Sequence, residues 1–345
     1  MKTEDVLNQL NRMFRIHPEF KNHIIDKLKR PTAARIEAHS GCNARCIHCP
    51  RSEMTRYQGP MPRDIFIKAI EGLVELSENT GHPSCISHHL NGEPLLLDID
   101  ELIWRVNYTM DRLPNVEENS FFTNASLLTE EKSRKLCESK LNRLCFSFDG
   151  GTKEDYENVR IGLRFEEVFE NIKTFCRINK EEFNNKLKTQ CIFLPQKLNE
   201  KSVDAYYELM RPLGITDVGG TGISNIGGKI DTDSMRSFLQ FIGGIREAPC
   251  WRTFTDINVM ADGRVCACCQ DVLGSIILGD IKTQTMKEVW TGEIWNKWRV
   301  EFMQYKGGGR LSPEFDICNK CDFMMCMEPP YWWPKNELGE QWRSK

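Results

Sequence analysis

The sequence lacks an apolar run long enough to span a bilayer, and its first thirty residues contain no apolar segment of the kind that secretion signals carry. It also lacks an excess of charge, because 46 Lys and Arg residues face 49 Asp and Glu residues and leave a net charge of -3. Such a composition provides no basic surface for nucleic acid or anionic lipid. We therefore expect a cytoplasmic protein that has neither a nucleic-acid nor a membrane partner.

Cysteine, in contrast, is abundant, with 15 residues in 345. A disulfide framework is a poor explanation without a secretion signal, because a reducing compartment keeps thiols reduced. Ten of the cysteines fall into three clusters along the sequence: Cys42, Cys46 and Cys49; Cys250, Cys266, Cys268 and Cys269; and Cys318, Cys321 and Cys326. The other five are isolated: Cys85, Cys137, Cys145, Cys176 and Cys191. The clusters favour metal binding or catalysis, and the isolated cysteines are expected mostly in the core.

Short β-rich runs alternate with helical segments over most of the chain. The expected strands are 33–40, 84–91, 120–124, 143–149, 188–194 and 217–224. An apolar stripe at helical spacing marks the segment 98–113, with Asp98 and Glu101 as its capping pair, and a second stripe ends at Cys176, which should be buried. This alternation predicts an α/β fold, a partial (βα)6 TIM-like barrel over residues 31–230 that follows an N-terminal helical extension over residues 1–30.

The pattern changes near Cys250. The run INVMADGRVCACC predicts a hairpin that turns at Ala261, Asp262 and Gly263, and the run TMKEVWTGEIWNKWRVEFMQ is helical. A CxxC pair follows at Cys318 and Cys321. We therefore expect a small cysteine-bearing C-terminal domain over residues 231–345.

The strands carry polar residues on one face. In the strand 143–149, the residues Leu144, Phe146 and Phe148 share one face, so helices should cover it, and the other face should line the lumen. A purely structural barrel would fill its centre with branched apolar side chains. The polar residues on the expected lumen face include Glu37, His39, His89, Arg143, Cys145, Ser147 and Asp149. Glu37, His39, His89, Arg143 and Cys145 are candidates for substrate binding or proton transfer, although each alone could be an ordinary core polar residue.

Cys42, Cys46 and Cys49 follow the first strand directly, with gaps of three and two residues. An iron-sulfur cube has four irons, so a protein that supplies three thiolates leaves one iron open to ligate and activate a small molecule. A zinc site with His48 as the fourth ligand is the alternative. That site would require an awkwardly tight chelate, because His48 lies between Cys46 and Cys49.

This arrangement resembles the signature of the radical S-adenosylmethionine enzymes. The resemblance implies that Cys42, Cys46 and Cys49 hold a 4Fe-4S cluster whose open iron binds S-adenosylmethionine, and that cleavage gives a 5′-deoxyadenosyl radical. The run Asn91-Gly92-Glu93 resembles the family's GGE motif, which holds the methionyl ammonium group. Cofactor contacts are likewise implied for His48, which stands where the family usually has an aromatic residue, and for Asn124, Ser147 and Asp149.

Cys250, Cys268, Cys318 and Cys321 offer four thiolates in two pairs, which is enough to close a cluster completely. A zinc ribbon is the alternative. The spacing resembles the C-terminal SPASM or Twitch domain of many radical S-adenosylmethionine enzymes. Because the usual downstream pattern CxxCx5Cx3C is absent, the resemblance implies one auxiliary 4Fe-4S cluster, with Cys266, Cys269 and Cys326 as spare thiols.

The reaction is less constrained than the cofactor. The single-cluster spacing and the run Cys49-Pro50-Arg51 resemble the sugar and aminocyclitol dehydrogenases, and only 41 residues precede Cys42, fewer than the recognition domain of peptide-modifying relatives requires. We expect dehydrogenation of a hydroxyl-bearing small molecule, with a flavodoxin- or ferredoxin-type electron donor. The alternatives are an epimerase or a peptide-modifying enzyme with a cysteine hydrogen donor, and a non-catalytic zinc or iron-sulfur interaction protein.

Overall fold

The computed structural model describes residues 2, 4, 6, 28–78, 81–236, 250, 252–304 and 310–322. Most of the expected N-terminal extension and the spare thiol Cys326 lie outside these residues. Within the described part of the chain, no helix is long and apolar enough to cross a membrane.

A nine-stranded sheet organises the molecule, in the order β6-β5-β4-β3-β2-β1-β7-β8-β9. Its parallel strands β1 to β6 are Ala33–Ile36, Cys85–Ser87, Glu118–Thr123, Arg143–Ser147, Lys188–Phe193 and Asp217–Gly220. Consecutive strands are neighbours, as repeated βα units require. The strands predicted from the sequence are all present, and each ends earlier than predicted because the polar residues that follow form loops at the carboxyl edge.

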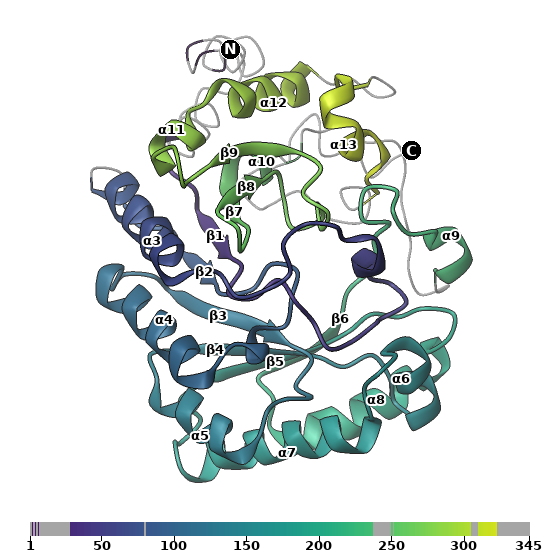
Figure 1. The fold of residues 1–345 in the computed structure, drawn as a ribbon. Coiled ribbons are helices and arrows are strands. Elements are labelled where there is room, and N and C mark those ends of the chain that lie inside the picture. The colour runs from purple at the N-terminus through teal and green to yellow at the C-terminus, as the bar shows by residue number, and fades with distance from the viewer. Residues whose placement is uncertain are drawn as a thin grey trace, which may run out of the picture.

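Helices cover the outer face of this curved sheet (Figure 1). They are α3 (Arg63–Ser77), α4 (Ile99–Arg112), α5 (Glu130–Glu138), α6 (Lys153–Val159), α7 (Phe165–Glu181) and α8 (Val203–Met210). Beneath them, Leu144, Phe146, Phe148 and Cys176 are buried in one apolar cluster, as the strand and helix patterns predict. The partial (βα)6 barrel is therefore confirmed.

Helix α4 begins as predicted at Asp98, whose side chain accepts hydrogen bonds from the backbone N–H groups of Asp100 and Glu101. Glu101, the second residue of the expected capping pair, has other partners. The Glu101 carboxylate instead accepts hydrogen bonds from the guanidinium groups of Arg63 and Arg105. Packing between α3 and α4 thus determines where this side chain points.

The C-terminal hairpin continues the barrel sheet. Strand β7 (Asp256–Val259) pairs in parallel with β1, and β8 (Arg264–Cys266) and β9 (Ile277–Asp280) follow in antiparallel order. The predicted turn is confirmed, because Gly263 N donates to Met260 O at 2.9 Å and Gly263 has a φ of 88°, which glycine adopts without strain. Strand β7 covers the edge of β1, which would otherwise expose unpaired backbone groups.

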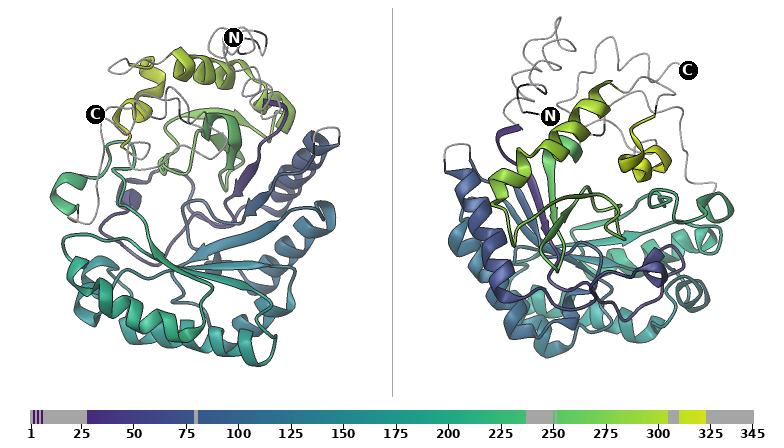
Figure 2. Two further views of the ribbon diagram at one scale, coloured as in Figure 1. Left: turned by 180° about the vertical axis from the view of Figure 1, so that it is seen from behind. Right: turned by 45° about the horizontal axis from the view of Figure 1, so that its top comes forward.

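Short helices complete this part of the chain: α9 (Thr232–Met235), α10 (Arg252–Thr255), α11 (Met286–Trp290), α12 (Glu293–Gln304) and α13 (Asp316–Lys320). The predicted helical run is interrupted between α11 and α12, where Gly292 packs 2.8 Å from Glu288 O, measured from the position that a Cβ would take. Trp290, Trp295 and Trp298 are fully buried between these helices and the sheet. Two further views show α11 and α12 lying over β7 to β9 (Figure 2).

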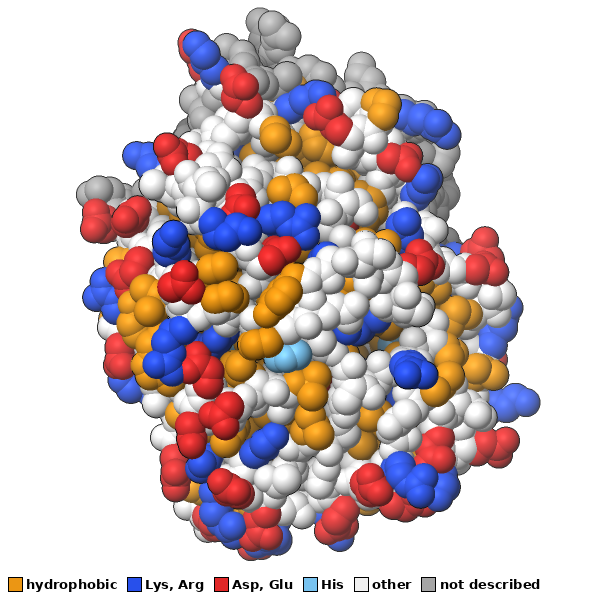
Figure 3. Space-filling view, in the orientation of Figure 1, with side chains coloured by type: hydrophobic (Ala, Val, Ile, Leu, Met, Phe, Trp, Pro, Cys, Tyr) orange, Lys and Arg blue, Asp and Glu red, His pale blue; other side chains and the backbone are white. Residues whose placement is uncertain are grey.

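Positive and negative side chains are interspersed over the face shown in Figure 3. This mixture agrees with the small net charge of the chain, -3. The distinctive chemistry lies in the interior, at the carboxyl ends of the strands and in the C-terminal part.

Candidate active site

The structure brings the three clustered cysteines together in the loop after β1. Cys42, Cys46 and Cys49 are each partly buried, and Cys49 N donates to Cys46 O at 3.1 Å in a tight turn. Burial, against the opposing charge of Arg160 and with added contributions from Asp149 and the thiols of Cys49 and Cys42, raises the pKa of Cys46 to about 11. Metal binding must therefore displace protons from thiols that already lie close to one another.

Two polar side chains contact these thiols from outside the loop. Asn124 Nδ2 lies 3.9 Å from Cys42 Sγ, and Arg160 Nη1 lies 3.7 Å from Cys46 Sγ. Both are placed to donate to sulfur, which helps to stabilise thiolates. Asn124 was expected at this site, whereas Arg160 was missed because nothing in its local sequence marks a buried arginine.

Asp149 holds this arginine. Its carboxylate accepts hydrogen bonds from Arg160 Nε at 2.7 Å and from Leu194 N at 2.7 Å, and it is fully buried. The cofactor contact implied for Asp149 stays a prediction; the carboxylate reaches the cysteine loop through Arg160. Asp149 is a positioning residue, because its carboxylate is enclosed by the protein's own donors.

His48 lies beside this pair. Its Nδ1 is 3.1 Å from Gln196 Nε2 and its Nε2 is 3.8 Å from Asp149 Oδ2. Burial lowers the pKa of His48 to about 4, so the imidazole is neutral at pH 7. The side chain is mostly enclosed, with 11% of it exposed.

The run Asn91-Gly92-Glu93 packs directly against the start of the cysteine loop. A Cβ on Gly92 would lie 1.8 Å from His39 O, so only glycine can occupy this position. Glu93 N donates to Gly41 O at 2.7 Å. The motif is therefore required for the local packing, whatever ligand it also holds.

The Glu93 carboxylate also joins two strand ends. It accepts hydrogen bonds from Thr123 Oγ1 at 2.7 Å and from Asn124 N at 2.8 Å, and burial raises its pKa. Glu93 is almost entirely buried. Its bonds tie the loop after β2 to the end of β3, where Asn124 reaches the cysteine loop.

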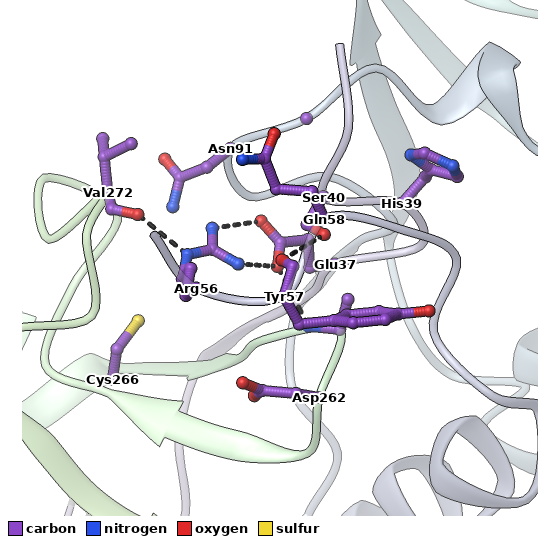
Figure 4. A network of polar contacts seen from close by, with 12 residues as sticks. Glu37, His39, Ser40, Arg56, Tyr57, Gln58, Asn91, Asp262, Cys266 and Val272 are labelled. Atoms are coloured by element: carbon purple, nitrogen blue, oxygen red, sulfur yellow. Dashed lines mark hydrogen bonds and ion pairs between the residues drawn. The ribbon is translucent and has the colours of Figure 1, made fainter. Parts of the chain in front are cut away.

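Glu37 was expected to face a ligand in the lumen, and the structure corrects this. The carboxylate pairs with both terminal nitrogens of Arg56, at 2.7 and 2.8 Å, and Ala261 N donates to it at 2.9 Å. Arg56 Nε also donates to Val272 O at 2.9 Å (Figure 4). Glu37 is fully buried, so it joins three segments and is not available to a substrate.

His39 and His89 remain near the lumen. His39 Nδ1 accepts a hydrogen bond from Gly41 N at 2.9 Å, which stabilises the turn into the cysteine loop. His89 Nε2 lies 3.1 Å from Gly92 O, and its ring lies 5.7 Å from that of Phe122. Burial lowers the pKa of His89 to about 4. Ser147 ends β4 and is partly buried on the same face.

Arg143 lies at the start of β4, away from the cysteine loop, and Cys145 lies in the middle of the same strand. Arg143 is near the carboxylates of Glu118 and Asp217, at 3.8 and 3.5 Å, and Cys145 Sγ lies 3.5 Å from Gln190 Oε1. Burial raises the pKa of Cys145 to about 11. Arg143 is the first residue of β4 and Cys145 is the third, so Arg143 lies at the end of such barrels that usually serves stability.

The four cysteines of the second set line a single pocket in the C-terminal part. Cys250, Cys268, Cys318 and Cys321 share it with the apolar side chains of Ala267, Trp298, Phe302 and Ile317, and with Gln270 and Arg252. Among the described residues, no group of three His, Cys, Asp or Glu side chains is arranged to hold a single metal ion. The grouping of all four thiols around one apolar space fits a fully ligated cluster.

Comparison with known proteins agrees with this geometry. Residues 36–210 match the Radical SAM superfamily, and residues 250–322 match an iron-sulfur cluster-binding domain, SPASM. A 2-deoxy-scyllo-inosamine dehydrogenase from Niallia circulans, which depends on S-adenosyl-L-methionine, is 29% identical over 36% of this chain and 47% of its own length. A probable GTP 3′,8-cyclase from Methanothermobacter thermautotrophicus is 32% identical over 40% of this chain and 42% of its own length. The chain thus matches less than half of each curated relative.

Solved structures support the fold. BtrN in complex with AdoMet and 2-DOIA superposes with a TM-score of 0.56, at 20% identity over 84% of this chain and 92% of that one. SuiB from Streptococcus suis, bound to precursor peptide SuiA, gives a TM-score of 0.62, at 13% identity over 90% of this chain and 74% of that one. The two family matches imply 4Fe-4S clusters and S-adenosylmethionine as cofactors. The chain therefore belongs to the radical SAM superfamily and carries a C-terminal SPASM domain.

Proposed function

We propose that the enzyme dehydrogenates a hydroxyl-bearing small molecule, such as a sugar or an aminocyclitol. When bound at the loop of Cys42, Cys46 and Cys49, the 4Fe-4S cluster and S-adenosylmethionine supply a 5′-deoxyadenosyl radical that removes a hydrogen atom from the substrate carbon. The hydroxyl proton would go to a base, and Cys250, Cys268, Cys318 and Cys321 would hold an auxiliary 4Fe-4S cluster that would accept one electron. The substrate thereby loses two hydrogens.

One contact carries this proposal. Asn91, in the motif that packs on the cysteine loop, lies against the auxiliary cysteine segment: with its amide nitrogen facing that segment, it donates to Cys269 O at 3.3 Å. Cys269 directly follows the proposed ligand Cys268. This contact supports an electron acceptor next to the residues proposed to hold the radical source, as an oxidation requires and a redox-neutral rearrangement does not.

His89 is the proposed base. Because its Nε2 faces the carbonyl oxygen of Gly92 at 3.1 Å, Nε2 carries the hydrogen and Nδ1 is left as an acceptor. The lowered pKa, about 4, keeps this nitrogen unprotonated at neutral pH. Among the lumen candidates, His89 combines partial exposure with a ring nitrogen that the contact to Gly92 leaves as an acceptor.

Several assignments accompany this proposal. Asn91, Gly92, Glu93, Asn124 and Ser147 form the binding surface for S-adenosylmethionine, while His48 and Asp149 support it through Arg160. The barrel spans residues 31–230 and the auxiliary domain 231–345. A flavodoxin- or ferredoxin-type protein delivers the electron that starts each turnover.

Epimerisation is the second candidate, and Cys269 favours it. Its thiol is partly buried at the same junction, where it could return a hydrogen atom to a substrate carbon. In that reaction the reductant named above would have to reset the thiol with one electron and one proton. The fold likeness to a peptide-binding relative adds no support of its own, since 13% identity shows the fold alone.

Product analysis distinguishes these reactions. Reduced protein, kept free of oxygen, is incubated in deuterated water with S-adenosylmethionine and a panel of sugars, aminocyclitols and peptides. Loss of two hydrogens by mass spectrometry supports dehydrogenation, whereas uptake of one deuterium indicates epimerisation. Absence of 5′-deoxyadenosine with every substrate would contradict both proposals.

A further inference from the structure

The auxiliary pocket contains one charged side chain besides its cysteines. Of the described residues that line it, only Arg252 is ionic, and the walls are otherwise Ala267, Trp298, Phe302, Ile317 and Gln270. The Arg252 side chain is 7% exposed, and the thiols of Cys269, Cys268 and Cys250 interact with its charge. A positive charge in such a poorly hydrated place acts strongly on any charge beside it.

Asp256 holds Arg252 in this position. Arg252 Nη1 donates to Asp256 Oδ2 at 2.7 Å, and Thr255 Oγ1 donates to the other carboxylate oxygen at 2.8 Å. The carboxylate is 1% exposed. Arg252 thus has a fixed geometry, which a flexible surface arginine would lack.

The same carboxylate is connected to the barrel lumen through Arg35. Arg35 Nη1 donates to Asp256 Oδ2 at 2.6 Å, so the two arginines share one oxygen atom. Arg35 lies on the lumen face of β1, since Ala34 and Ile36 on either side of it are buried in the apolar core, and 26% of its side chain is exposed. The sheet register Ala33 to Asp256 creates this junction between barrel and auxiliary domain.

We propose that Arg252 raises the reduction potential of the auxiliary 4Fe-4S cluster, and that Asp256 links it to Arg35 as a sensor of charge in the substrate lumen. The inference rests on the proposed cluster ligands Cys250, Cys268, Cys318 and Cys321. Reduction adds one negative charge to a cluster, and a nearby cation stabilises that added charge. Arg252 therefore favours acceptance of the substrate's electron. The negative charge of Asp256 partly offsets this effect of Arg252 on the reduction potential.

The test measures a potential, which a merely structural role would not shift in a charge-dependent way. The full chain carries Cys42→Ala, Cys46→Ala and Cys49→Ala, so that only the auxiliary cluster contributes to an EPR-monitored redox titration. Arg252→Gln should lower the equilibrium constant for reduction about tenfold, which is about 59 mV for one electron. Arg252→Lys should keep most of the original potential because the charge is retained.

Opposite signs provide the sharpest comparison. Asp256→Asn should raise the potential, and Arg35→Gln should lower it by less than Arg252→Gln does. Arg112→Gln, which removes an exposed arginine paired with Glu71 on the barrel surface, should leave it unchanged. If the cluster is present and Arg252→Gln and Asp256→Asn shift the potential in the same direction or not at all, the inference is wrong and the proposed function stands. If the triple variant retains no iron, the four-cysteine ligand set fails, and the inference fails with it.

Discussion

The two cysteine sites share one arrangement, an arginine held by a buried aspartate, in different surroundings. At the loop of Cys42, Cys46 and Cys49, Arg160 contacts a thiol and is held by the buried carboxylate of Asp149. At the pocket of Cys250, Cys268, Cys318 and Cys321, Arg252 lies among the thiols and is held by the buried Asp256. Each site thus places one fixed guanidinium beside sulfur.

The sites differ in ligand number and in the polarity of their walls. The three-cysteine loop has one thiolate fewer than a cluster has irons, so we call it the open site, and Asn124, His48 and the Asn91 to Glu93 segment surround it with hydrogen-bonding groups. The four-cysteine pocket has mainly apolar walls and enough thiolates to saturate a cluster. An open, polar site can ligate and orient a substrate-sized molecule, whereas a closed, apolar one suits the passage of electrons. This difference predicts a division of labour.

The largest effect should come from the open site. Cys46→Ala removes one of only three ligands, so we expect formation of 5′-deoxyadenosine from S-adenosylmethionine to be abolished. Chromatography of reduced, anaerobic reactions measures this product. Cys176→Ala is the matched control, because this thiol is buried in the barrel core and belongs to neither proposed ligand set, and it should leave the product in place. Comparable product from both variants would remove the distinction between the sites.

Loss of a ligand at the closed site should be more selective. Cys321→Ala should lower bound iron from about eight to about four atoms per chain, as expected for two 4Fe-4S clusters. Cleavage of S-adenosylmethionine should continue in part, while the oxidised product should no longer form. Iron and sulfide analysis, together with the ratio of oxidised product to 5′-deoxyadenosine, provides the measurement. Cys266→Ala should retain the iron, since Cys266 does not line the pocket as described. A parallel loss of both products in Cys321→Ala would argue against separate roles.

A smaller effect is expected where the two sites are joined. Arg56 follows the three-cysteine loop, and Val272 follows Cys268, so the Glu37–Arg56 pair connects both segments (Figure 4). Arg56→Met leaves Glu37 buried without its cation and should cost about 3–5 kcal/mol of unfolding free energy. Denaturant unfolding under anaerobic conditions measures this.

The double variant Glu37→Leu, Arg56→Met separates charge from packing. Because it leaves no unpaired buried charge, much of the stability should return. The ratio of oxidised product to 5′-deoxyadenosine should stay low if the pair also sets the spacing of the two sites. A single variant as stable as the unaltered protein would show that the pair contributes little to joining them.

The sequence predicted the parts of this comparison that depend on local pattern. Strand and helix periodicity gave the barrel, because alternation and apolar stripes reflect which face of an element is covered. Cysteine spacing separated three ligands from four. The turn at Gly263 was also foreseeable, since the hairpin signal lies within a few residues.

The relations between distant segments could not be predicted in this way. The pairing of β7 with β1, which joins Asp256 to Arg35, depends on residues more than two hundred positions apart. Glu37 was assigned to the lumen from strand phase, but it is fully buried, and its partner Arg56 comes from a loop with no periodic signal. Arg160 and Arg252 were missed for the same reason. Buried ion pairs leave no mark in local sequence, because either partner alone resembles a surface residue.

The smallest expected effect is a loss of folding stability at low pH. Three histidines adjoin the open site or the strand that leads to it, and burial lowers the pKa of His48, His88 and His89 to about 4. The residues lining the closed pocket include no histidine among those described. A fall in pH should therefore destabilise the barrel before it destabilises the C-terminal part.

His88 offers a test that leaves both cysteine sites untouched. It lies on the outer side of the sheet with its Nε2 2.8 Å from Asn119 Oδ1, and it is fully buried. Between its folded pKa of about 4 and its unfolded value near 6.5, the unfolded chain binds more protons, so stability falls as the pH drops below about 6.5. At pH 5 the loss is about 2 kcal/mol for this histidine, by the linkage between pKa shift and free energy. His88→Gln should flatten the pH dependence of unfolding between pH 7 and 5 relative to the unaltered protein, while a control substitution at exposed Glu130 should not. An unchanged slope in His88→Gln would show that His88 does not contribute to the acid sensitivity.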